Sequence, residues 1–72
     1  MTILVTGAAG YVGNTIVKRL VVQGKSVRAM THNLEKGQYR LADVRDKIEI
    51  IQGDVTDPTS LEAALQDVTT VV

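Results

Sequence analysis

The sequence predicts an α/β fold in which a parallel sheet carries helices on both faces. Three observations support this prediction. Short apolar runs alternate with amphipathic segments along the 72 residues, no linker or repeat interrupts the alternation, and the apolar residues are mainly Val, Ile, Leu and Ala, without Phe or Trp. Apolar runs of this composition are typical of strands that are buried on both faces. The expected order is strand, helix, strand, weaker helix, strand, helix, strand.

The first strand is predicted at Thr2–Val5 and the first helix at Val12–Gln23. The strand is a nearly continuous apolar run. The helical segment repeats apolar residues at intervals of three and four, which places them on one face. Gly24 stands where a residue in the left-handed conformation commonly ends a helix.

The second and third strands are predicted at Ser26–Met30 and Ile48–Ile51. Between them, Asn33–Asp46 gives a weaker helical pattern, because Gly37 lowers the helix propensity. Arg28 lies in the second strand, and the pattern leaves open which face of the sheet its side chain meets.

The last helix is predicted to begin at Asp57, a suitable cap, with Pro58 at the first helical position. A capping box over Thr59–Glu62 is the alternative and moves the start toward the carboxyl end. The final strand, Thr69–Val72, stops at the last residue. We therefore interpret residues 1–72 as the N-terminal part of a single, truncated domain. The apolar edge of its last strand is expected to pair with the rest of that domain or with a second copy.

Composition and charge argue against several classes of function. The formal net charge is zero, so nothing favours a nucleic acid or an anionic membrane as partner. The chain has no Cys and one His, which leaves no cluster for a metal ion. It begins without a signal peptide, and no run approaches the ~20 apolar residues of a membrane span. The predicted location is the cytoplasm or an organelle matrix.

Three glycines between the first strand and the first helix have the spacing G-x-x-G-x-x-G. Gly7 permits the tight turn from strand to helix. Gly10 lets the backbone approach a pyrophosphate, and Gly13 lets the helix pack closely on the strands. The N–H groups of the first helical turn then point at the phosphates. In this position the pattern predicts a dinucleotide site, and the alternative is a tight turn without a ligand.

The segment Thr6–Gly13 resembles the nucleotide fingerprint of the atypical and extended short-chain dehydrogenases/reductases, a group that includes sugar-nucleotide epimerases and NmrA-like proteins. The resemblance continues through Val27–Met30 and Gly53–Leu61, so it covers most of the chain. It implies a Rossmann-like βαβαβαβ half-domain whose partner is NAD or NADP. The loop residues that it assigns to the cofactor are Gly7, Ala9, Gly10, Tyr11, Val12 and Gly13. Tyr11 is also expected to anchor the start of the helix by hydrophobic contact.

The same resemblance assigns Asp54 to the adenine amino group and Val55 to the wall of the adenine pocket. The position of Asp54 agrees with this, because a carboxylate just past the carboxyl end of a strand lies where open α/β sheets bind ligands. The alternative role of Asp54 is to cap or turn the chain.

The residues after the second strand favour NADP over NAD. An acidic residue ~20 positions after the glycines usually binds the ribose hydroxyls of NAD, whereas this chain has Thr31 there. His32 stands where relatives that use NADP often carry arginine. We predict that Thr31, His32 and Asn33 surround the 2′-phosphate, with Lys36 as a further candidate. NAD is the alternative cofactor, and an exposed His32 without a role is the alternative for that residue.

No catalytic residue is predicted within the chain. The resemblance implies a Tyr-x-x-x-Lys pair, but Thr15 follows Tyr11 by four positions and Asp43 follows Tyr39. The predicted function is therefore the NAD(P)-binding portion of an oxidoreductase or epimerase. The alternative is an NmrA-like regulator or assembly factor that binds the dinucleotide without turnover.

Overall fold

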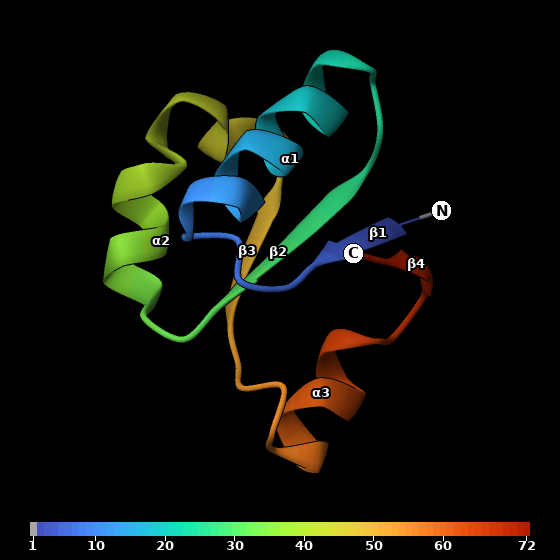
Figure 1. The fold of residues 1–72 in the computed structure, drawn as a ribbon. Helices are drawn as coiled ribbons and strands as arrows, with labels where there is room; N and C mark the ends of the chain where they lie inside the picture. Colours follow the sequence, from blue (N-terminus) through green and yellow to red (C-terminus); the bar gives the residue numbers. More distant parts are fainter. Residues whose placement is uncertain (1) are drawn as a thin grey trace.

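The structure is a computed structural model that describes residues 2–72 (Figure 1). Over those residues, four strands form one parallel sheet in the spatial order β3-β2-β1-β4. The bounds are Thr2–Val5 for β1, Val27–Thr31 for β2, Glu49–Gln52 for β3 and Val68–Val71 for β4. The predicted α/β fold with a parallel sheet is confirmed, and each strand lies within a residue of its predicted place.

Helices cover both faces of this sheet, as the alternation of strands and helices predicts. One face carries α1 (Tyr11–Val22), α2 (Leu34–Arg40) and the 3₁₀ helix η1 (Ala42–Lys47). The other face carries α3 (Pro58–Ala64), which stands apart from the other helices in Figure 1.

Two separate apolar clusters fill the space between the sheet and these helices. The cluster beneath α1, α2 and η1 has as buried members Val5, Ala8, Val17, Val27, Ala29 and Leu41. The cluster beneath α3 has as buried members Leu4, Met30 and Ala64. Side chains alternate between the two faces along a strand. Neighbours such as Leu4 and Val5 therefore belong to different clusters, which is why the apolar runs are continuous.

Arg28 projects from β2 toward the face that α3 covers. Its Nε donates to Glu49 Oε1 at 2.8 Å, and its Nη1 donates to the carbonyl oxygens of Ala64 at 2.8 Å and Gln66 at 2.7 Å. The last carbonyls of a helix have no partner within the helix. Arg28 therefore caps the carboxyl end of α3 and fixes it to the sheet.

Local caps define the ends of α3 and α1. Asp57 Oδ1 accepts a hydrogen bond from Thr59 N at 3.1 Å, and Pro58 is the first residue of α3. The predicted Asp57 cap is confirmed, and the alternative start at Thr59 is wrong. Gly24 has φ +76°, as expected for a left-handed residue after α1.

Tyr11 begins α1, one residue before the predicted start. Tyr11 is 84% exposed, and the buried residue of α1 is Val17. The prediction that Tyr11 anchors the helix by hydrophobic contact is therefore wrong, because its side chain lies on the solvent side of the helix.

α2 is a helix despite Gly37. Asn33 caps it by accepting a hydrogen bond from Lys36 N at 3.0 Å. A Cβ built on Gly37 would lie only 2.6 Å from Thr31 Cγ2. The glycine that lowers the helix propensity thus lets α2 approach the end of β2, and this places the start of α2 beside the residues that follow the strand.

Candidate functional site

The candidate site lies at the carboxyl ends of β1, β2 and β3, where open α/β sheets bind ligands. Two clefts adjoin there. The first, of about 280 Å³, is called the β3 cleft and is lined by Thr6, Gly7, Met30, His32, Gly53 and Val55. The second, of about 230 Å³, is called the α2 cleft and is lined by Gly7, Ala9, Gly10, Thr31, His32, Asn33 and Lys36. Gly7 and His32 belong to both clefts.

The glycine loop between β1 and α1 forms a tight turn. Gly7 has φ +60°, in the left-handed region that favours glycine. Gly10 is the N-cap of α1, and its N–H donates to Gly7 O at 3.0 Å. Asn14 N donates back to Gly10 O at 3.0 Å. The N–H groups of residues 11–13 precede that bond, so they lie at the open end of the helix.

Gly13 packs against the loop itself. A Cβ at this position would overlap Gly7 O and would lie 3.0 Å from Ala8 Cα. The sequence predicts that Gly13 lets the helix pack on the strands. The structure shows close packing at Gly13, but the nearest atoms belong to the backbone of the glycine loop and not to a strand. Ala8 N donates in turn to Met30 O at 3.1 Å, which ties the loop to β2.

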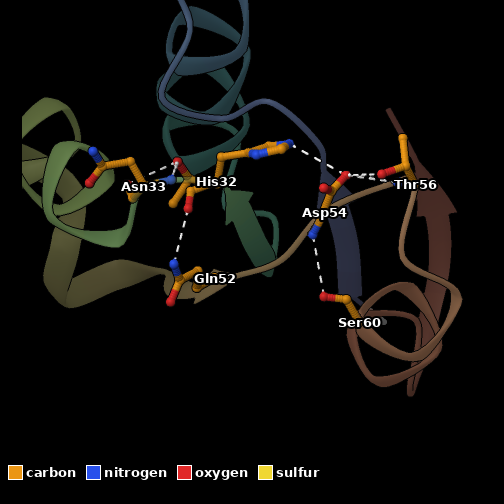
Figure 2. A network of polar contacts seen from close by, with 7 residues as sticks. His32, Asn33, Gln52, Asp54, Thr56 and Ser60 are labelled. Carbon is orange, nitrogen blue, oxygen red and sulfur yellow. Dashed lines mark hydrogen bonds and ion pairs between the residues drawn. The ribbon is translucent and has the colours of Figure 1, made fainter.

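Asp54 follows β3, and the residues after it hold its carboxylate in place. Its Oδ1 accepts hydrogen bonds from Thr56 N at 2.8 Å and Thr56 Oγ1 at 2.7 Å, and its own N–H donates to Ser60 Oγ at 3.3 Å (Figure 2). The N–H of Thr56, and then its hydroxyl, lower the pKa of Asp54 against a smaller opposing effect of burial. At neutral pH the carboxylate is therefore charged and fixed in direction. Asp54 turns the chain, as the alternative interpretation holds, and its carboxylate also faces His32.

The three predicted residues after β2 differ in what their polar atoms do. Thr31 is 4% exposed, and its hydroxyl donates to Asn33 O at 3.1 Å and accepts from Asn33 N at 3.3 Å. The Asn33 side chain caps α2. The His32 side chain is 73% exposed, and its Nε2 lies 3.5 Å from Asp54 Oδ1 (Figure 2). Thus His32 presents its ring to the clefts, while the Thr31 hydroxyl and Asn33 Oδ1 form hydrogen bonds within the chain.

Three residues that orient the site were not predicted. Thr56 and Ser60 hold Asp54, and Gln52 Nε2 donates to His32 O at 3.1 Å. The D-x-T spacing of Asp54 and Thr56 is a sequence signal for such a turn. The bond from Gln52 joins β3 to the residue that follows β2, so no local sequence pattern predicts it.

The strand order, the left-handed glycine turn into α1 and the clefts at the carboxyl ends of the strands define a Rossmann-like α/β domain. A solved structure described as the closed form of serine dehydrogenase complexed with NADP+ has the same fold. It aligns with a TM-score of 0.79 and 31% identity, over 97% of this chain and 28% of that chain. The family model of the NmrA-like family matches residues 1–72, and the chain belongs to that family.

Two curated relatives differ in the function that their names give. The photosystem II assembly factor of Cyanophora paradoxa is 36% identical over 72 residues, which are 100% of this chain and 22% of that protein. UDP-glucose 4-epimerase of Mycolicibacterium smegmatis is 38% identical over 60 residues, which cover 79% of this chain and 19% of that protein. The chain thus spans about a fifth of the length of these two relatives.

Two negative findings apply to residues 2–72. No helix among them is long and apolar enough to cross a membrane. The same residues bring together no group of three or more His, Asp or Glu side chains that could hold a metal ion.

Proposed function

We propose that the chain is the dinucleotide-binding portion of an NAD(P)-dependent oxidoreductase or epimerase of the NmrA-like family, with NADP as the preferred cofactor. The geometry of the glycine loop carries the proposal. The left-handed turn at Gly7 puts Gly10 at the N-cap, and both line the α2 cleft. The N–H groups of residues 11–13 and the positive end of the helix dipole favour a phosphate group at this point. The pyrophosphate binds there.

Adenine binds in the β3 cleft. Val55 is half exposed and lines this cleft together with Gly53 and Met30, which gives a flat ring an apolar wall. Asp54 lies between two of these residues in the chain and offers a charged acceptor for the adenine amino group. An apolar wall with one fixed polar group is the usual composition of a small-molecule site.

The 2′-phosphate of NADP binds in the α2 cleft. The residues that line this cleft include Lys36 and His32 and no carboxylate. A carboxylate is the usual partner of the free ribose hydroxyls of NAD. The charge of this cleft therefore supports NADP, and the complex of the related serine dehydrogenase with NADP+ agrees with that choice. Thr31 and Asn33 shape the cleft.

A second candidate function is dinucleotide binding without turnover, as in a regulator or an assembly factor. The match to a photosystem II assembly factor over the whole chain favours it. Both functions use the same loop and clefts. A Tyr-x-x-x-Lys pair in a longer parent protein would favour the enzyme, and an intact glycine loop without that pair would favour the regulator. For either function we retain the cytoplasm or an organelle matrix as the predicted location.

Gly10→Ala tests the loop directly. The added methyl group lies 3.2 Å from Gly7 O, where the backbone would approach the pyrophosphate, whereas the φ of −73° at Gly10 is open to alanine. We expect the fold to be kept and the affinity for NADP to fall about tenfold or more, a loss of about 1.4 kcal/mol or more in binding free energy. Isothermal titration calorimetry with NADP and with NAD measures both binding and preference.

Gly24→Ala is the matched control. Gly24 has φ +76° and follows α1 at the opposite end of the sheet, so alanine there strains the backbone without reaching the clefts. We expect lower stability and an unchanged affinity for NADP. Equal affinity in the wild type and in Gly10→Ala would contradict the proposed site.

A further inference from the structure

The backbone of His32 is fixed on both sides while its ring is exposed. Gln52 Nε2 donates to His32 O at 3.1 Å, and two hydrogen bonds join the preceding Thr31 to the following Asn33. The side chain itself is 73% exposed. The imidazole can therefore change rotamer without any movement of the strand end.

The contact between His32 and Asp54 is long for an ion pair. Their Nε2 and Oδ1 atoms lie 3.5 Å apart, whereas Thr56 holds the same oxygen at 2.7 and 2.8 Å. Charge-assisted hydrogen bonds are usually about 2.7–2.9 Å, and pairs between exposed groups contribute little. A competing anion can thus draw the ring away from Asp54.

His32 stands in the wall that the two clefts share, with opposite charges on its two sides. Asp54 faces it from the loop after β3, and Lys36 lines the α2 cleft on the side of the helix. The glycine loop at residues 6–13 carries no charged side chain. A protonated ring is attracted to Asp54 and repelled by Lys36, unless an anion lies between the ring and Lys36.

We propose that His32 determines cofactor specificity by moving between Asp54 and the 2′-phosphate of NADP. When the 2′-phosphate enters the α2 cleft, the ring turns to it and leaves the carboxylate of Asp54 open to the adenine amino group. When the ribose has a free 2′-hydroxyl, the ring stays on Asp54 and competes with adenine. The two subsites are therefore coupled through one side chain. This inference rests on the proposed function, which gives the positions of adenine and phosphate.

The coupling predicts a cofactor preference that depends on pH. Histidine changes its charge between about pH 5 and pH 8. Protonation gives the ring a stronger interaction with the phosphate, and with NAD it gives a stronger competing contact with Asp54. Relative to the same ratio in a variant without the imidazole, we expect the ratio of NADP affinity to NAD affinity to rise about threefold to tenfold when the pH falls from about 8 to about 6.

The variant His32→Gln separates the contribution of the imidazole to the pH dependence from the contribution of the titrating phosphate. Glutamine keeps a neutral hydrogen-bond donor but cannot gain a charge. The phosphate group loses charge near pH 6 in both proteins, so the difference between wild type and His32→Gln at each pH reports the imidazole alone. Lys36→Gln is the second control: we expect it to lower NADP affinity at both pH values and to leave the pH dependence of the ratio in place.

Nuclear magnetic resonance supplies a direct reading, because His32 is the single histidine of the chain and its ring signals need no assignment. We expect saturating NADP to change the Hε1 and Cε1 chemical shifts strongly at about pH 6, and NAD to change them much less. If both nucleotides bind, but the affinity ratio changes with pH in the same way in the wild type and in His32→Gln and the ring signals respond alike, the inference is overturned while the proposed function stands. If neither nucleotide binds the wild type, the proposed function fails and the inference with it.

Discussion

Thr56 supplies both hydrogen bonds that hold Asp54 Oδ1, one from its N–H and one from its hydroxyl. Both favour the charged carboxylate and lower the pKa of Asp54. A carboxylate whose pKa is lower in the folded chain stabilises the fold at pH values above its ordinary range. That contribution is lost as the pH falls through the lowered pKa.

Thr56→Val removes the hydroxyl and keeps the N–H. We expect the pKa of Asp54 to rise part of the way toward its ordinary value, because the N–H is the larger cause of the shift. The stability that Asp54 contributes at neutral pH should then be smaller than in the wild type, and its loss on acidification should be complete at a higher pH. A carbon-13 titration of the Asp54 carboxyl group measures the first effect, and urea unfolding at a series of pH values measures the second. Thr56→Ser keeps both donors and should behave as the wild type; a Thr56→Val titration identical to the wild type would refute this account.

At the scale of secondary-structure elements, the packing of α2 on β2 opposes the local preference of its sequence. Gly37 is buried against Thr31, and a Cβ there would lie 2.6 Å from Thr31 Cγ2. Helix propensity alone predicts that alanine stabilises such a position by about 0.8–1 kcal/mol. Crowding in a packed interior costs about 1–3 kcal/mol. The contact with Thr31 therefore decides whether alanine at position 37 stabilises or destabilises the chain.

Gly37→Ala is therefore expected to destabilise the chain, by up to about 2 kcal/mol after the gain in helix propensity is subtracted. Thr31→Ser removes the crowded methyl group while it keeps the hydroxyl that binds Asn33. In the double variant Gly37→Ala with Thr31→Ser, we expect alanine to become neutral or stabilising. Urea unfolding of the four proteins gives the coupling free energy, and a stabilising Gly37→Ala in the wild-type background would show that the helix tolerates the methyl group.

The elements that the sequence predicted well are those whose signals are local. Asp57 and Pro58 mark the start of α3 within two residues, and the turn at Gly7 lies directly between a strand and a helix. The features that were missed depend on contacts between separate elements. Arg28 meets Ala64 across 36 positions. Gly37 and Thr31 are near in sequence, but their contact depends on how α2 packs against the end of β2. The periodicity of a single sequence does not reveal such contacts. The sequence therefore did not show which face of the sheet Arg28 meets, and it predicted the helix around Gly37 only weakly.

The candidate site divides in the same way. The places of Gly7 and Gly10 in the turn between a strand and a helix, and of Asp54 just past a strand, could be predicted from neighbouring residues. The internal hydrogen bonds of Thr31 with Asn33 were not predicted, since residue type alone does not tell whether a hydroxyl faces a ligand or its own backbone. The 3.5 Å approach of His32 to Asp54 also needed the structure, because it depends on the pairing of β2 with β3.

At the scale of the whole molecule, the described sheet has β3 and β4 as its edges. The side chains of β4 beyond Val68 are exposed, and Val71 and Val72 are about half exposed. An exposed apolar edge strand can pair with another strand. In a longer parent protein, the rest of the domain would pair with the edge of β4. In the 72-residue chain alone, a second copy of the chain would pair with it.

We expect the isolated chain to associate as its concentration rises, and Val71→Lys to shift it toward the monomer, because a charge on an edge strand opposes pairing. Sedimentation velocity over a range of concentrations measures both proteins. Val22→Lys is the control, since Val22 is exposed at the end of α1 and lies away from the sheet edge. A wild-type chain that stays monomeric at every concentration would contradict the predicted self-association through the β4 edge.

The end of β4 also meets the beginning of the glycine loop. The N–H and the hydroxyl of Thr6 both donate to Val72 O, at 3.1 and 3.0 Å, although the two residues are 66 positions apart. Contacts this distant in sequence are expected to form late in folding, because the loop between the two residues must close before they form. The β1–α1–β2 unit is built from nearer contacts and is expected to assemble first. We therefore expect the turn that would receive the pyrophosphate to reach its final hydrogen bonding only when β4 joins the sheet, so that ligand binding is gained after the β1–α1–β2 unit has formed.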